Sequence, residues 1–180
     1  YTLINSLPYE LHHTSMSVYT PCASCEEEYH SPLDRRFYSQ INACEACGPT
    51  LNLQDQRGET ISSDNQIAIN EVAKFIRRGK IIALKSLGGF HLICDAHNTQ
   101  AVKKLRQAKQ RPDKPFALMA LNHLSLEPYV ELNENSKQYL THSTAPIVLV
   151  PKKSGCDDLL KDIAPGLSQL GCMLPYTTLH

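Results

Sequence analysis

Two Cys-x-x-Cys pairs constrain this chain more than any other feature of its sequence. Cys22 and Cys25 form the first pair, Cys44 and Cys47 form the second, and eighteen residues separate the pairs. Each pair places two thiolates on one side of a tight loop, and two such loops supply the tetrahedral sulfur cage that Zn²⁺ prefers. Because all four ligands come from protein, no water can be activated at the metal. The spacing therefore predicts a structural zinc site.

Other interpretations of these cysteines are disulfides, an iron–sulfur cluster or four unconnected thiols. The sequence has seven cysteines, an odd number, and no apolar signal segment at its start, which disfavours disulfides in a secreted chain. The spacing alone does not distinguish zinc from an iron–sulfur cluster. His12 and His13 offer two more ligands, but with four cysteines present we interpret them as exposed loop histidines. The zinc cage and the surplus thiols favour a reducing, cytoplasmic setting.

The length and charge of the chain limit its architecture and its partners. Its 180 residues suffice for one ordinary domain and one small metal-held module. Eighteen basic residues balance eighteen acidic ones, so no net field attracts nucleic acid or a membrane surface. No apolar run is long enough to cross a membrane. The chain opens at Tyr1 without an initiator Met and stops at His180 soon after a strand-like run, from which we expect a fragment of a larger protein.

The first third of the sequence predicts a lead-in followed by the zinc finger. Residues 1–21 show no helical period and predict strands and loops. Residues 22–58 form the predicted finger, which ends in a turn near Gly58. A module of this size has too few apolar residues for a core of its own, so we expect it to pack around the few that it has, namely Tyr29, Leu33, Phe37 and Tyr38.

Arg35 and Arg36 lie beside these aromatic residues, a combination also found on nucleic-acid-binding surfaces. The balanced overall charge favours a different role, in which Asp34 pairs with an arginine and shapes the loop. Both roles make the segment between the cysteine pairs a polar surface.

Residues 62–180 alternate helical and strand patterns. Ser63 and Gln66 have the spacing of a capping box, and Gly79 ends the helical pattern that follows. Asn98 can cap a second helix, whose buried face we expect to carry Ala101, Leu105 and Ala108. Near-continuous apolar runs predict strands buried on both faces, at residues 80–85, 90–94, 116–121 and 147–150. The alternation predicts an α/β domain with a twisted, mostly buried sheet.

Two segments of this domain are candidates for ligand binding. Lys109, Arg111 and Lys114 follow the second helix in a loop stiffened by two prolines, where their charges can bind phosphate or simply complement the helix dipole as a solvated basic turn. From the loop alone, the solvated turn is the favoured interpretation. The second candidate runs from Lys85 to His91, where paired glycines allow close approach of a ligand but a hairpin turn explains them equally well.

Several segments, taken in order, resemble the HypF family, the carbamoyltransferases of nickel–iron hydrogenase maturation. They cover nearly the whole chain: Cys22–Cys25, Tyr29–Phe37, Cys44–Pro49, Gly88–Ala96, Lys109–Pro115, Ala145–Leu149 and Asp162–Leu167. The resemblance implies the second zinc finger of such a protein followed by the front portion of its YrdC-like domain. It also implies that Lys109 and Arg111 contact nucleotide phosphate, reversing the interpretation of that loop, and that Lys85, His91 and Lys114 line the same pocket. It assigns no catalytic residue.

In that family, carbamoyl phosphate is the source of carbamate, which reacts with Mg²⁺-bound ATP in the YrdC-like domain to give carbamoyl-adenylate and pyrophosphate. The carbamoyl group then passes to the C-terminal cysteine of HypE. The first finger, the acylphosphatase domain, the transfer domain and the later Ser-x-Asn segment of YrdC-like domains are not found in this sequence. We therefore expect the isolated chain to be inactive or nearly so. The alternative function is an RNA-binding module that uses Arg35, Arg36 and the basic loop.

Overall fold

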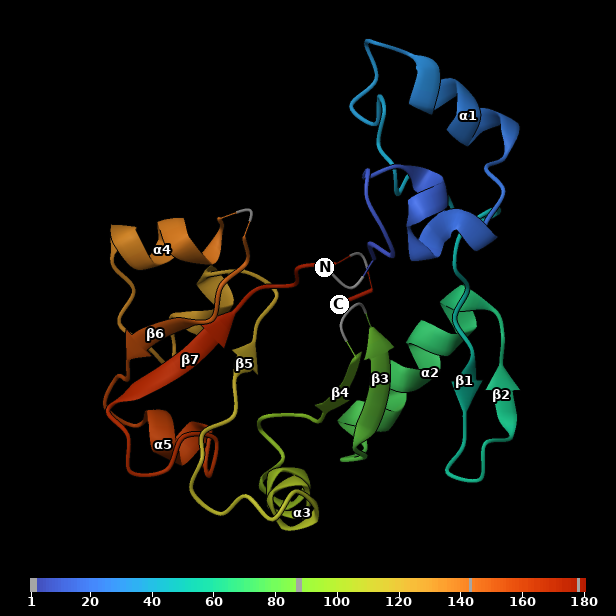
Figure 1. The fold of residues 1–180 in the computed structure, drawn as a ribbon. Coiled ribbons are helices and arrows are strands. Elements are labelled where there is room, and N and C mark those ends of the chain that lie inside the picture. The colour runs from blue at the N-terminus through green and yellow to red at the C-terminus, as the bar shows by residue number, and fades with distance from the viewer. Residues whose placement is uncertain (1–2, 87–88, 143, 178) are drawn as a thin grey trace. The chain divides into compact units, whose positions relative to one another are not determined.

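The computed structural model describes residues 3–86, 89–142, 144–177 and 179–180, and it divides the chain into two compact units (Figure 1). The N-terminal unit runs to Ala73 and includes Gly89, and the C-terminal unit comprises residues 74–86 and 90–180. Each unit has its own set of internal contacts and is described by itself. No helix among the described residues is both long and apolar enough to cross a membrane.

The lead-in of the N-terminal unit is helical where strands were expected. Two short 3₁₀ helices, Leu11–His13 and Ser15–Val18, follow each other, and an antiparallel bridge joins Ile4 to Thr14. Thr14 is fully buried between the two helices, where its hydroxyl accepts from the Met16 amide (3.1 Å) and donates to the Leu11 carbonyl (2.8 Å). This capping hydroxyl starts the second turn, a role that hydrophobic periodicity does not reveal.

The finger contains helix α1 (Ala23–His30), which begins directly after Cys22. The expected aromatic packing is present only in part: the rings of Tyr29 and Tyr38 stack with their centroids 5.3 Å apart, whereas Leu33 is 99% exposed. The buried side chain of Gln40 connects α1 to the lead-in through hydrogen bonds. Its amide donates to the Tyr29 hydroxyl (2.9 Å), and its carbonyl oxygen accepts from the backbone amide of Leu11 (2.7 Å).

A small hairpin follows the finger. Strands β1 (Leu53–Gln54) and β2 (Thr60–Ser62) pair antiparallel around a turn in which the Asp55 carboxylate accepts from the amides of Arg57 and Glu59. Gly58 adopts φ +84°, a left-handed conformation that glycine reaches at little cost. The turn predicted near Gly58 is therefore present, between two paired strands.

Helix α2 (Asn65–Arg77) ends as its sequence predicts but starts one residue later than expected. The Asp64 carboxylate accepts from the Ile67 amide (2.8 Å), so Asp64 is the N-cap, and the capping box expected between Ser63 and Gln66 is wrong. Gly79, at φ +73°, closes the C-terminus, and a Cβ at this position would lie 2.6 Å from the side chain of Asn98.

In the C-terminal unit, β3 (Ile82–Ser86) and β4 (Gly89–Ile93) form a two-stranded sheet. Half-buried and exposed residues alternate along both strands, and Phe90 is 70% exposed. The expectation that both faces of these strands are covered is therefore wrong for this chain. Of the two glycines predicted to form the turn, Gly88 lies outside the described residues and Gly89 begins β4.

This unit also contains a separate three-stranded sheet, in the order β5 (Leu118–Met119), β7 (Gln169–Met173), β6 (Val148–Pro151). Strand β5 runs parallel to β7, and β6 runs antiparallel to it, with Val148 opposite Cys172. The run predicted as a strand at residues 116–121 is thus a strand over only two residues.

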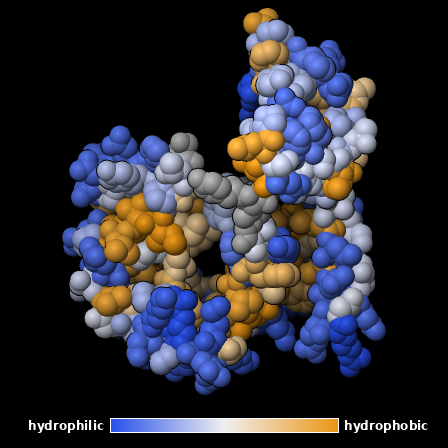
Figure 2. Space-filling model, in the orientation of Figure 1, coloured by the Kyte–Doolittle hydropathy of each residue, from blue (hydrophilic) through white to orange (hydrophobic). Residues whose placement is uncertain are grey.

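The main core of the unit lies between this sheet and its helices α3 (Thr99–Ala108), α4 (Glu134–Leu140) and α5 (Cys156–Leu159), with a 3₁₀ helix at Leu124–Leu126. The buried side chains are Val102, Leu126, Val130, Leu140, Val150, Cys156, Leu160, Ile163, Ala164, Leu170 and Cys172. The face of the molecule drawn in Figure 2 also carries hydrophobic residues, and exposed apolar side chains include Phe90, Ile147 and Leu149.

Candidate functional site

The four predicted cysteine ligands come together in the N-terminal unit. The Sγ atoms of Cys22 and Cys44 lie 3.7 Å apart, those of Cys44 and Cys47 3.7 Å, and those of Cys25 and Cys47 3.6 Å. A tetrahedral ion with Zn–S bonds of about 2.3 Å requires sulfurs about 3.8 Å apart, so the cluster matches zinc closely. All four sulfurs lie within 4.8 Å of one another. The residues present fit a structural Zn²⁺ with a closed coordination shell.

The local backbone conformation positions these four sulfur atoms. Cys22 precedes the first residue of α1 and Cys25 lies in its first turn, whereas Cys44 and Cys47 flank a turn closed by a 2.7 Å hydrogen bond from the Gly48 amide to the Cys44 carbonyl. A Cβ on Gly48 would lie 2.8 Å from the Ala43 Cβ and from the Cys44 carbonyl oxygen. Only glycine therefore fits this turn without a shift of the backbone.

The protein environment of the thiols explains why a cation belongs among them. Burial raises the pKa of the Cys25 thiol to about 12, and the neighbouring thiols add to the rise. Hydrogen bonds from the backbone lower the pKa of Cys44, and they lower the pKa of Cys47 to about 6. Four adjacent thiolates repel one another, so a divalent cation is needed to hold all four in the charged form.

His12 and His13 are not part of the sulfur cluster and lie instead beside Glu10, with which they form a separate group of possible metal ligands. The exposed His12 ring is 3.3 Å from the Glu10 carboxylate, and Nδ1 of His13 is 2.7 Å from the Pro8 carbonyl oxygen. The expectation of exposed loop histidines is correct only for the exposure of His12, because both residues lie in the 3₁₀ helix Leu11–His13 and His13 is half-buried.

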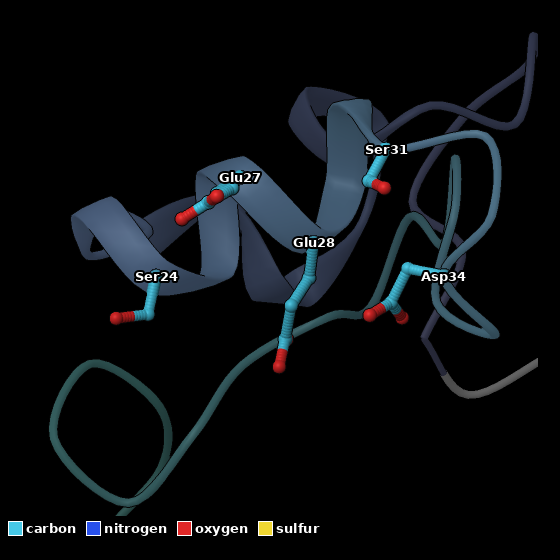
Figure 3. Close-up of a pocket in the computed structure, with 5 residues that line it drawn as sticks. All are labelled: Ser24, Glu27, Glu28, Ser31 and Asp34. Atoms are coloured by element: carbon cyan, nitrogen blue, oxygen red, sulfur yellow. The ribbon is translucent and has the colours of Figure 1, made fainter.

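The finger carries a hollow whose lining is rich in carboxylates. This shallow cavity of about 290 Å³ is lined by residues of α1 and the turn after it, among them the carboxylates of Glu27, Glu28 and Asp34 (Figure 3). Arg36 donates to Glu28 at 2.6 Å, which lowers the pKa of that carboxyl, and the Asp34 carboxylate accepts from the Arg36 amide. The ion pair expected with Asp34 is therefore made with Glu28. These carboxylates count against an RNA surface here.

The predicted anion-binding loop connects α3 to β5. Asn98 caps the helix as expected, with its side chain accepting from the Ala101 amide, but Ala108 is exposed. Lys109 and Lys114 are exposed on the loop. Arg111 is half-buried and folds back on the loop, donating to the carbonyls of Lys114 (3.3 Å) and Pro115 (2.6 Å).

Sequence reasoning missed Arg106, which lies beneath this loop. Arg106 is 8% exposed, and its hydrogen-bond partners among the described residues are backbone carbonyls. Its guanidinium stacks on the Phe116 ring with Cζ 4.5 Å from the centroid. Arg111 lies over the same ring at 5.3 Å. The available signal was the position of Arg106 one residue after Leu105, on the apolar side of α3, where a charged residue is unusual.

Lys85 and His91 lie on the β3–β4 sheet. Lys85 is exposed, with its Nζ 5.4 Å from the centroid of the Phe90 ring. His91 is half-buried, and its Nδ1 lies 3.3 Å from Nε2 of His180 and 3.4 Å from the Tyr176 hydroxyl. Burial and the nearby His91 lower the pKa of His180. In the described part of the chain, no hydrogen bond or ring contact joins Lys85 or His91 to the basic loop, so the predicted nucleotide-binding residues form two separate groups.

Comparison with known proteins gives the class of the chain. Residues 74–180 match the Sua5/YciO/YrdC family, described as "Telomere recombination", and residues 22–54 match the HypF finger. The family match covers more than half of the chain, which therefore belongs to the YrdC-like family and carries a zinc finger before its α/β domain. The fold class expected from the sequence is confirmed.

The particular proteins that the chain resembles are carbamoyltransferases. It is 43% identical to carbamoyltransferase HypF of Rhodobacter capsulatus over all 180 residues, which make up 23% of that protein. A crystal structure of full-length HypF in the phosphate- and nucleotide-bound form matches 99% of the chain and 23% of its own, with 37% identity and a TM-score of 0.84. Threonylcarbamoyl-AMP synthase of Vibrio vulnificus is 36% identical over 73 residues, 40% of this chain and 39% of that one.

These findings confirm the resemblance to HypF over the whole chain. The chain spans about a quarter of the length of the HypF relatives and is homologous to transferases.

Proposed function

We propose that this chain is the nucleotide-activating part of a carbamoyltransferase that uses carbamoyl phosphate and ATP. The observation that carries the proposal is the homology to HypF along all 180 residues, with the Lys109 and Arg111 loop inside the family match. A relative solved with phosphate and nucleotide, and another named for making threonylcarbamoyl-AMP, support an adenylate as the product. By analogy, the product here is carbamoyl-adenylate.

The proposed step is adenylation of carbamate. A carbamate oxygen attacks the α-phosphorus of ATP, the bond between the α-phosphorus and the bridging oxygen breaks, and pyrophosphate leaves. Charge builds on the phosphate oxygens, so the step needs convergent cations, supplied by Mg²⁺ and basic side chains. Arg111 uses two of its five N–H donors on carbonyls of its own loop, which orients the others for phosphate, and exposed Lys109 adds a point charge.

The remaining parts of the proposal concern zinc, the partner and the location. Zinc anchors the finger and takes no part in the reaction, because its four ligands are all cysteines. The acceptor of the carbamoyl group is the C-terminal cysteine of HypE. The cytoplasm is the proposed location, because the sulfur cage and three further free thiols require a reducing compartment.

ATP binding by a Lys109→Ala variant tests the proposal. Because a charge-assisted hydrogen bond contributes about 1.5–3 kcal/mol, the dissociation constant for Mg-ATP should rise roughly 10- to 100-fold in calorimetric titration. Lys103→Ala, which removes an exposed lysine of α3, is the matched control and should bind like the wild type. Equal affinity of both variants would refute the role of the loop. The isolated chain should show little ATP-dependent turnover of carbamoyl phosphate, and substantial turnover would contradict that expectation.

A further inference from the structure

The loop that carries the predicted phosphate contacts has too few backbone donors to organise itself. Pro112 and Pro115 lack an N–H group, so the loop has two backbone donors fewer than it has carbonyl acceptors. Gln110, just before them, has φ +48°, an uncommon conformation for a residue with a side chain. A loop of this composition needs donors from elsewhere, because a buried carbonyl without a partner is costly.

Arg106 supplies these donors. Its Nη1 bonds the carbonyls of Arg111 (2.8 Å), Pro112 (3.0 Å) and Lys114 (3.1 Å). The other side of the same guanidinium binds a distant part of the chain, with Nε 2.7 Å from the Asp162 carbonyl and Nη2 3.1 Å from the Ile163 carbonyl. One side chain therefore sets the positions of three loop carbonyls relative to the core segment at residues 162–163.

The guanidinium of Arg106 has no acidic partner among the described residues. In the described part of the chain its hydrogen-bond partners are all neutral carbonyls, and no ion pair joins it to a carboxylate. The carbonyls turned toward Arg106 are turned away from any anion bound outside the loop, which they would repel. The basic loop with Lys109, Arg111 and Lys114 thus follows a helix whose last turn carries a buried cation, Arg106, and Asp113 is the only acidic residue between Lys109 and Lys114 in the sequence. The arrangement favours a polyanionic ligand.

We propose that Arg106 is the positioning residue of the nucleotide site: it holds the 111–115 loop in the conformation that presents Lys109 and Arg111 to the phosphates, without touching the nucleotide itself. The proposal rests on the proposed function. It adds a residue whose planar, five-donor group cannot be replaced by lysine, although lysine keeps the charge.

The test uses Arg106→Lys in the chain and, in parallel, in the complete carbamoyltransferase proposed above. We expect the dissociation constant for Mg-ATP to rise at least tenfold while the unfolding transition of the core persists. Lys103→Ala again serves as the control on the same helix. In the double variant Arg106→Lys/Lys109→Ala, the dissociation constant should rise by a clearly smaller factor than the product of the factors for the two single variants. The reason is that Arg106 acts through the loop that carries Lys109. A purely structural role predicts independent, multiplicative effects.

Pro112→Ala provides a second variant in case Arg106→Lys does not fold. It loosens the loop while leaving Arg106 in place, and we expect affinity to fall about two- to fivefold. Trypsin should also cleave after Lys109 faster in both variants than in the control, since the loop is released.

Four results would overturn the proposal, and the first is a double variant whose two effects simply multiply. Wild-type affinity in a folded Arg106→Lys variant overturns this proposal alone, as does unchanged affinity in Pro112→Ala if Arg106→Lys does not fold. Absence of ATP binding by the wild-type proteins overturns both this proposal and the proposed function.

Discussion

Removal of zinc should unfold the finger and leave the C-terminal unit folded. Between residues 22 and 50, only Cys25, Gln40 and Gly48 are buried, whereas Leu33 is 99% exposed. Hydrophobic burial therefore contributes little to the stability of the finger. The Arg36–Glu28 pair is partly exposed, and pairs of this kind add little to stability because water and salt screen them.

Zinc supplies most of the remaining stabilisation. Three of the sulfur–sulfur distances are already 3.6–3.7 Å, close to the spacing of the metal-bound state, and all four sulfurs lie within 4.8 Å of one another, so little rearrangement opposes binding. Structural zinc in small fingers contributes about 10–16 kcal/mol near neutral pH. Whole domains have free energies of unfolding of about 5–15 kcal/mol. The free energy lost with the ion is therefore larger than the stability that a module with so small an interior can have without it.

The assay combines zinc release with proteolysis under reducing conditions. An indicator dye should report one zinc per chain, and a chelator should withdraw it while trypsin begins to cleave after Arg35 and Arg36. The urea unfolding midpoint of the C-terminal unit should not change. Cys44→Ser should lose the ion, and Cys94→Ser, a thiol outside the cage, should keep it. A metal-free finger that still resists trypsin would refute the argument.

Two further predictions concern the C-terminal unit. Leu126 is fully buried in the core, so Leu126→Ala should lower its free energy of unfolding by about 2.7–5 kcal/mol in urea titration, with zinc content unchanged; a loss below 1 kcal/mol would contradict the described packing. Burial raises the pKa of Cys172 to about 12 and also raises that of Cys156, so neither thiol should be alkylated at pH 8 before unfolding. Mass spectrometry of iodoacetamide-treated native protein checks this, and rapid labelling of Cys172 would show that the core is open.

Sequence patterns predicted features whose causes lie close together along the chain. The spacing of the two cysteine pairs gave the four-sulfur cage, and the helix signals at Gly79 and Asn98 mark real helix ends. A ligand pair, a cap or a turn depends on residues within a few positions of one another, so a local pattern carries enough information. Even here Asp64 replaced Ser63 as the cap, because neighbouring polar residues compete for the same amide.

Long-range contacts were beyond such patterns. The sequence places Lys109, Arg111 and Lys114 in one basic loop, but it does not show that Arg111 folds back on Pro115 or that Arg106 is buried beneath them. Arg106 meets the Asp162 carbonyl across 56 positions of the chain, and its donors are satisfied only when the loop and that segment are packed together. Metal ligation and helix ends follow from neighbouring residues, whereas burial of a charge follows from groups that meet only in the folded protein.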